Sequence, residues 1–179
     1  MSVLFISESY LKNNTVVDDN VDQRLIIPSI VAVQDMRLHP ILGTPLFDDL
    51  KTKVTNSTLN ANEITLINDF ISKMLLQWTM YELTTSMLFK YRNKSVATQG
   101  GDARQIDYKD LQYLKDDWKN KAQFYDERLI NHLIDNKSLF PNYTAVSDDI
   151  SAKKSAYNTS FYLGGGRSDC WKDDWRDER

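Results

Sequence analysis

The side chains of this chain that could do acid–base, nucleophilic or metal chemistry are few and lie far apart. The two histidines, His39 and His132, stand alone, and Cys170 is the single cysteine. A lone cysteine forms no internal disulfide and supplies too few thiolates for a cysteine-based zinc site. We therefore expect no catalytic centre, no bound metal and no cofactor, and we expect His39 to pack or cap where it lies.

Adjacent carboxylates recur along the chain, but their spacing does not suit a metal site. Neighbours in a helix point about 100° apart, so they do not converge on one ion. Helix caps and solvated faces explain most of them. The Gly164–Arg167 stretch lacks the Lys-Ser/Thr ending of a phosphate loop, and we interpret it as a hinge. The acidic pairs are Asp18-Asp19, Asp48-Asp49, Asp116-Asp117, Asp148-Asp149 and Asp173-Asp174.

The charge balance argues against a dedicated nucleic-acid binder, since the formal net charge is −3 and the pI about 5.4. Lys90, Arg92 and Lys94 form a local basic cluster. We interpret it as charge at a helix end rather than as a phosphate site. We also expect no membrane association, because no run approaches the ~18 apolar residues of a membrane span. Residues 1–7 lack the basic start of a signal peptide.

Helical periodicity dominates the sequence and predicts an all-α fold, a small antiparallel helical bundle. We expect two long helices over residues 61–94 and 107–136, with Asn60, Glu63 and Asp107 at their starts. Shorter helices are predicted over residues 7–11, from Asp18 or Asp19 to His39, and over 45–54. Pro28 either kinks the second of these or marks its true first turn.

A sharp corner between two apolar helices is the most distinctive local feature. Pro40 disfavours a helical residue before it, so we expect the first helix to end near His39. Gly43 can take the positive φ of a tight reversal. Thr44 then offers an N-cap hydroxyl, and Pro45 suits the first helical position.

The composition changes after residue 141, so we divide the chain into a helical domain (1–141) and an extended C-terminal arm (142–179). The arm has no sustained apolar period but is rich in aromatic residues, which suits docking onto a partner. The candidate docking residues are Tyr157, Phe161, Tyr162, Trp171 and Trp175.

The corner and the helices after it resemble the head-to-tail connector (adaptor) proteins of tailed bacteriophages, and among them the neck ring proteins of crAss-like phages. The motif lies in residues 31–50, and the helical architecture over residues 16–136 is similar too. The C-terminal arm is a polar extension like that of these proteins, but it does not match theirs residue by residue. The residues that carry the motif are Ala32, Asp35 or Arg37, Leu38, Ile41, Leu42, Gly43, Leu46, Phe47 and Leu50.

The resemblance implies a mechanical role in the neck of a virion. Such proteins form a ring, commonly of about twelve copies, that sits below the portal protein, extends the channel for double-stranded DNA and docks the next neck or tail protein. Localisation would be the virion, with assembly in the host cytoplasm. The acidic balance suits a channel wall that lets DNA pass without specific binding.

Two other classes of function stay open. One is a small helical interaction or regulatory protein, dimeric, that buries Trp171 and Trp175. The other is a helical enzyme with a site assembled from His132, Asp116 and Tyr125, although we expect no enzyme because no motif supports one.

Overall fold

The computed structural model describes residues 3–92, 95–98, 108–145, 147 and 149–154. These residues are mostly helical, so the prediction of an all-α fold is confirmed. The elements, in chain order, are α1 (Glu8–Asn14), α2 (Gln23–Val33), the π-helical turn η1 (Gln34–Leu38), α3 (His39–Leu42), α4 (Thr44–Asn56), α5 (Ala61–Thr65), the π-helical segment η2 (Leu66–Ile71), α6 (Ser72–Leu88), the short strands β1 (Phe89–Arg92) and β2 (Ser95–Thr98), α7 (Tyr108–Asp135) and the 3-10 turn η3 (Pro141–Tyr143).

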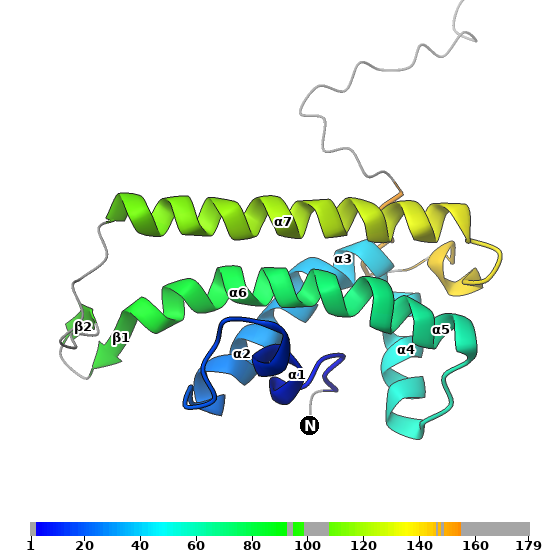
Figure 1. Ribbon diagram of the computed structural model, residues 1–179. Coiled ribbons are helices and arrows are strands. Elements are labelled where there is room, and N and C mark those ends of the chain that lie inside the picture. Colours follow the sequence, from blue (N-terminus) through cyan, green and yellow to red (C-terminus); the bar gives the residue numbers. More distant parts are fainter. Residues whose placement is uncertain (1–2, 93–94, 99–107, 146, 148, 155–179) are drawn as a thin grey trace, which may run out of the picture.

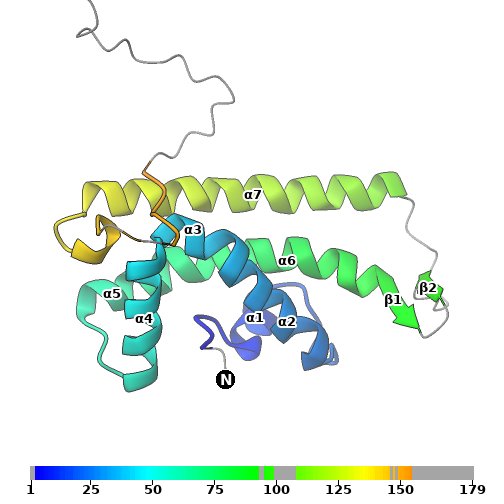
Figure 2. The same ribbon diagram turned by 180° about the vertical axis from the view of Figure 1, so that it is seen from behind.

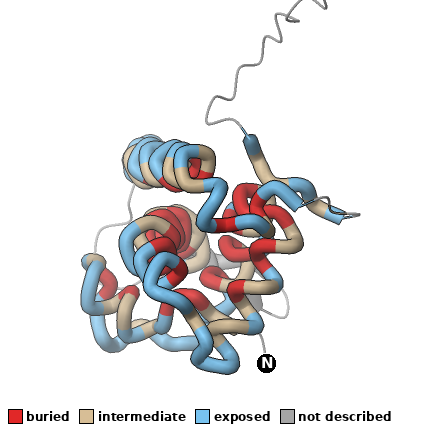
Figure 3. The backbone as a smooth tube through the Cα atoms, turned by 90° about the vertical axis from the view of Figure 1, so that its right-hand side faces the viewer, coloured by how far each residue is buried: buried red, intermediate tan, exposed pale blue. Residues whose placement is uncertain are grey.

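Helix α6 is the centre of the molecule. Figures 1 and 2 show α7 lying along it in the opposite direction, while α2 crosses its other side. Apolar residues therefore occupy several faces of α6, and Met74, Leu75 and Leu83 are fully buried. Each such side chain contributes about 1.5–3 kcal/mol on leaving water. In Figure 3 the buried positions lie on the inner sides of the helices, and the outer sides are exposed.

Residues 23–42 form one unbroken helix, so the prediction that it ends near His39 is wrong. Within η1 the hydrogen bonding shifts by one residue, and the His39 N–H donates to the Gln34 carbonyl oxygen. This wider turn leaves room for the Pro40 ring, which would otherwise meet the carbonyl four residues back. The helix stops instead at Gly43, which has φ +75°.

The start of this helix also differs from the prediction. Asp22, rather than Asp18 or Asp19, is the N-cap, and its carboxylate accepts the Arg24 N–H at 2.9 Å. Pro28 lies inside the helix. By length and composition alone, residues 23–42 form the one helix among the described residues that could cross a membrane. Its buried residues, among them Ile26, Ile30 and Val33, belong to the hydrophobic core.

A buried glutamine fastens the N-terminal segment to this helix. Gln34 is 1% exposed, and its Oε1 accepts the Phe5 N–H at 2.8 Å. Its Nε2 donates to the Val3 carbonyl oxygen at 3.0 Å. Both ends of the side-chain amide are therefore paired, as a buried polar group requires.

The long helix through α6 begins as predicted and ends earlier. The capping box is present, since Asn60 Oδ1 accepts the Glu63 N–H and Glu63 Oε2 accepts the Asn60 N–H, both at 2.9 Å. The helix ends at Leu88 rather than near Lys94, because the aromatic and β-branched residues that follow favour a strand. Strand β1 pairs antiparallel with β2, Phe89 opposite Thr98.

The basic cluster is consequently not at a helix end. Lys90 and Arg92 belong to β1, and Lys94 lies outside the described residues. The predicted second long helix is α7, which ends one residue before Asn136; its expected cap, Asp107, also lies outside the described residues.

The first part of the predicted arm packs on the helical body. Tyr143 is 2% exposed within the core. The Thr44 N–H donates to the Ile150 carbonyl oxygen at 2.9 Å, and the Lys153 N–H donates to the Pro40 carbonyl oxygen at 3.1 Å. The expected division at residue 141 thus places in the arm a core residue, Tyr143, and the segment 149–153 that bonds to the corner.

Candidate binding pocket

The predicted corner is present, and Gly43 plays the part expected of it. A Cβ on this residue would lie 2.7 Å from the Ala152 backbone nitrogen, and φ is +75°. Both the conformation and the close approach of the C-terminal segment therefore require glycine. Pro45 lies in the first turn of α4, as predicted.

Thr44 does not cap its own helix, which corrects the prediction. It is the first residue of α4, and Gly43 occupies the cap position without a side-chain bond. The Thr44 hydroxyl instead donates to Asp149 Oδ2 at 3.1 Å and accepts the Ile150 N–H at 3.2 Å. The hydroxyl therefore ties the corner to a segment far along the chain.

His39 packs at the corner, as expected. Its ring stacks on Phe47 with centroids 4.4 Å apart, and its Nε2 lies 2.8 Å from Thr44 Oγ1. Since that hydroxyl donates to Asp149, His39 fits best as the donor to Thr44.

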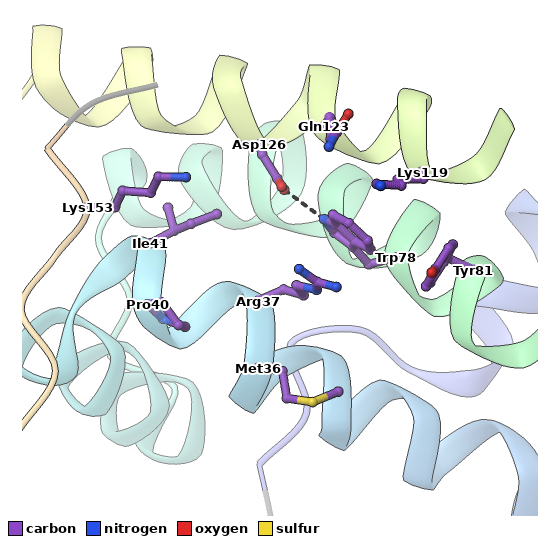
Figure 4. A pocket seen from close by; sticks show the side chains of 10 residues that line it. All are labelled: Met36, Arg37, Pro40, Ile41, Trp78, Tyr81, Lys119, Gln123, Asp126 and Lys153. Atoms are coloured by element: carbon purple, nitrogen blue, oxygen red, sulfur yellow. Dashed lines mark hydrogen bonds between the residues drawn. The ribbon is translucent and has the colours of Figure 1, made fainter. Parts of the chain in front are cut away.

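The corner and the two long helices together enclose a polar recess beside Trp78, which we call the Trp78 pocket (Figure 4). Its volume is about 350 Å³. This volume is at the lower end of the range for ligand sites and suits one or two side chains of a partner. Its lining residues are Met36, Arg37, Pro40, Ile41, Trp78, Tyr81, Lys119, Gln123, Asp126 and Lys153.

Trp78 contacts a carboxylate at the edge of its ring and a guanidinium over one face of the ring. The indole N–H donates to Asp126 Oδ1 at 2.9 Å, the dashed line in Figure 4. The guanidinium of Arg37 lies 4.0 Å above the ring centroid. Desolvation in this corner of the pocket raises the pKa of Asp126 to about 6, although the Trp78 hydrogen bond and the charges of Lys153 and Arg37 oppose the shift.

The pocket is predominantly cationic. Arg37 comes from η1, Lys119 from α7 and Lys153 from the C-terminal segment, and Asp126 is the one acid among the lining residues. Within the part of the chain that the structure describes, none of these three cations lies within 4.0 Å of a carboxylate in an ion pair. The pocket therefore offers unpaired positive charge to an anionic group.

A second recess, of about 330 Å³, is mostly apolar and lies near the other end of α6 and α7. Several of its residues are unusually exposed for their type: Val16 is 81%, Leu114 39% and Met87 38% exposed. We call this surface the apolar face. It is lined by Val16, Val17, Asp18, Val21, Met80, Thr84, Met87, Leu111, Leu114 and Trp118.

The residues considered for an enzyme site do not come together. Asp116, Tyr125 and His132 all lie on α7, and at about 1.5 Å per residue the first and last are roughly 24 Å apart along the helix. The His132 ring stacks on Phe70 with centroids 4.0 Å apart, and desolvation lowers its pKa.

The structure does not describe the five aromatic docking candidates or Cys170, since all lie beyond Lys154. The role of the five aromatic residues in docking therefore stays a prediction. Among the described residues, no group of three or more His, Cys, Asp or Glu side chains is placed to hold a metal ion.

The sequence reasoning missed the Trp78 pocket. Lys119, Gln123 and Asp126 recur at helical spacing, so they share one face of α7. That spacing was a usable signal, although a charged helix face is usually just solvated. Nothing local indicates that Arg37 and Lys153 join this face.

One comparison with known proteins gave a match. Residues 38–148 match a family described as a family of unknown function (DUF6712). Neither the comparison with curated proteins nor that with solved structures gave a match.

Proposed function

Since this chain belongs to the DUF6712 family, whose function is unknown, we propose a function from its own residues: it is a structural subunit of the head-to-tail connector of a tailed bacteriophage. Copies of the chain form a ring below the portal protein. The ring extends the DNA channel and docks the next neck or tail protein.

The observation that carries this proposal is the corner. Six of the apolar residues through which the sequence resembles connector proteins are buried in it, and the C-terminal segment packs against it. A motif of this kind acts through packing rather than through chemistry, as a mechanical function requires. The residues are Leu38, Ile41, Leu42, Leu46, Phe47 and Leu50.

The apolar face supports assembly between copies. Large exposed apolar patches on a soluble protein commonly mark protein–protein contacts. Here Val16, Met87 and Leu114 surround a recess that a neighbouring copy could fill. A contact between different surfaces of adjacent copies repeats around an axis and closes into a ring.

The test is the size and shape of the full-length protein, alone and mixed with the portal protein of the same virus. Negative-stain electron microscopy and mass photometry should show rings in one or both conditions. The variant Leu114→Asp should abolish them, because a carboxylate in the contact would lose its water. Leu139→Asp is the matched control, since Leu139 is 47% exposed but lies outside the apolar face.

Two outcomes would reject the connector. The first is a protein that stays monomeric and does not bind the portal protein, because it would then form no ring. A closed dimer sensitive to Leu114→Asp would instead favour the alternative, a small helical interaction or regulatory protein.

A further inference from the structure

We propose that the Trp78 pocket binds the acidic, tryptophan-bearing segment 169–178 of a second copy of this chain. The inference rests on the proposed function in one respect, namely that the second copy is the neighbour in the ring. It adds a site for the arm, and hence a contact that joins adjacent subunits.

The charge of the pocket selects an anionic occupant. Arg37, Lys119 and Lys153 reach it from three separate elements. Asp126, the one acid in the lining, already accepts the Trp78 N–H. An incoming carboxylate therefore meets cations that no carboxylate of the described residues contacts within 4.0 Å, and a charge-assisted hydrogen bond to them is among the stronger polar contacts.

The aromatic lining selects an occupant that also carries a flat ring. The guanidinium carbon of Arg37 lies 4.0 Å from the centroid of the Trp78 ring. A guanidinium is planar, and an indole from a partner can stack on it. Tyr81 and the half-exposed Met36 widen this apolar side of the pocket.

Segment 169–178 of the sequence carries both features at close spacing. It contains Trp171 and Trp175, and its carboxylates outnumber its basic residues, Lys172 and Arg176. The acids are Asp169, Asp173, Asp174, Asp177 and Glu178. An acidic, tryptophan-bearing segment complements a cationic, tryptophan-walled pocket.

The length of the intervening chain allows the segment to reach a neighbour. Lys153 lines the pocket, so the described chain ends beside it. Residues 155–168 separate this point from the segment. Chain geometry limits the span of these residues to roughly 50 Å at full extension, which sets the farthest point that the segment can reach. Such a reach bridges two adjacent subunits of this size.

The test uses the full chain and reverses charge on each side of the contact. The pocket variant Lys119→Glu with Lys153→Glu, and the segment variant Asp173→Lys with Asp174→Lys, should each weaken self-association about tenfold or more. Combining the four substitutions should restore it, because both signs are then exchanged. The control is Lys109→Glu with Lys137→Glu, two exposed lysines that line neither the Trp78 pocket nor the apolar face, and it should associate as the parent does.

Cross-linking identifies which copy supplies the segment. A carbodiimide joins a lysine to a carboxylate in direct contact, and a mixture of ¹⁴N- and ¹⁵N-labelled chains separates links between copies from links within one. Links between Lys119 or Lys153 and Asp173 or Asp174 of different isotopic labels support the proposal. Links only within a chain, no links, or unchanged association of the charge variants would overturn it.

Failure of this contact is distinguishable from failure of the connector. Rings that form without links between the pocket and the segment reject the contact and retain the connector. Links between copies in particles that are not rings retain the contact and reject the connector.

Discussion

Asp126 is a carboxylate whose ionisation the fold opposes. Its group is desolvated between α7 and Trp78, and its pKa of about 6 exceeds the ordinary value of 3.8. The folded protein therefore holds this proton more tightly than the unfolded chain does. The negative charge costs stability above about pH 6, and that cost fades as the pH falls towards 4.

The variant Asp126→Asn tests this sign. Asparagine keeps an oxygen for the Trp78 N–H but carries no charge. We expect the variant to be more stable than the parent by about 1–2 kcal/mol at pH 7–8, after allowing for partial solvent screening. The difference should close below about pH 4.

Urea unfolding of both proteins between pH 4 and 8 measures that difference. The variant must be compared with the parent at the same pH, because His132 gives both proteins a pH dependence of the opposite sign. The pKa of His132 is lowered in the folded protein, so its protonation destabilises the fold as the pH falls. A parent more stable than Asp126→Asn at pH 8 would show that the carboxylate is stabilised by its cationic neighbours.

Gly43 is the backbone position least tolerant of a side chain. Gly43→Ala forces a non-glycine residue into φ +75° and brings its Cβ within 2.7 Å of the Ala152 nitrogen. We expect a loss of about 2–4 kcal/mol in the free energy of unfolding. Adding Ala152→Gly should not rescue the protein, because the clash is with the backbone. A neutral Gly43→Ala would contradict the geometry of the corner.

At the scale of elements, the C-terminal segment 149–153 belongs to the corner that it crosses. It exchanges backbone hydrogen bonds with Pro40 and Thr44 and presses Ala152 against Gly43. Sequence composition alone placed this segment in a free arm, because it lacks an apolar period. Its bonds are to the backbone, and composition does not report such bonds.

Two truncations separate the segment from the rest of the arm. Ending the chain after Ser147 should cost about 2–3 kcal/mol, because the bonds to Pro40 and Thr44 and the packing of Ala152 are lost. Ending it after Lys154 should leave the unfolding midpoint unchanged. Thermal melts followed by circular dichroism measure both, and equal midpoints would mean that the segment is not held by the corner.

The sequence predicts those helix boundaries whose cause lies in adjacent residues. Asn60 and Glu63 cap each other three residues apart, and Gly43 needs only its own conformational freedom. The errors arise where more distant packing decides the conformation. The helix passes Pro40 because η1 widens before it, and Thr44 bonds to residues more than a hundred positions away.

At the scale of the whole molecule, the family match covers less than the folded body. It begins at residue 38, close to the C-terminal end of the helix formed by residues 23–42. Ile26, Ile30 and Val33 lie before that point and are fully buried in the core that also contains α6. The matched region therefore lacks one wall of its own core.

A fragment of residues 38–148 should consequently fail to fold on its own. Without α1 and α2, several apolar faces of α6 that are buried in the full chain are exposed to water. The burial free energy that is lost exceeds the marginal stability of a domain of this size. We expect a broad thermal transition and poorly dispersed amide NMR signals. A chain of residues 1–154 is the control and should melt cooperatively, whereas a cooperative melt of the fragment would show that α6 and α7 suffice.

The Trp78 pocket illustrates why a site is harder to predict than a fold. Lys119, Gln123 and Asp126 can be assigned to one helix face from their spacing, but Arg37 reaches them from η1 and Lys153 from the C-terminal segment. Lys119, Gln123 and Asp126 lie within eight residues of one another in the sequence, whereas Arg37 and Lys153 lie far from them. The packing of η1 on α6 brings Arg37 to this face, and the packing of the C-terminal segment brings Lys153.

The bond between Thr44 and Ile150 joins residues 106 positions apart, which affects the order of events during protein synthesis. The corner is translated well before residues 149–153, which complete it. Contacts between distant positions form slowly because a long loop must close first. The nascent chain therefore carries an unfinished corner until residues 149–153 have emerged, and its native packing is completed after translation of the helices.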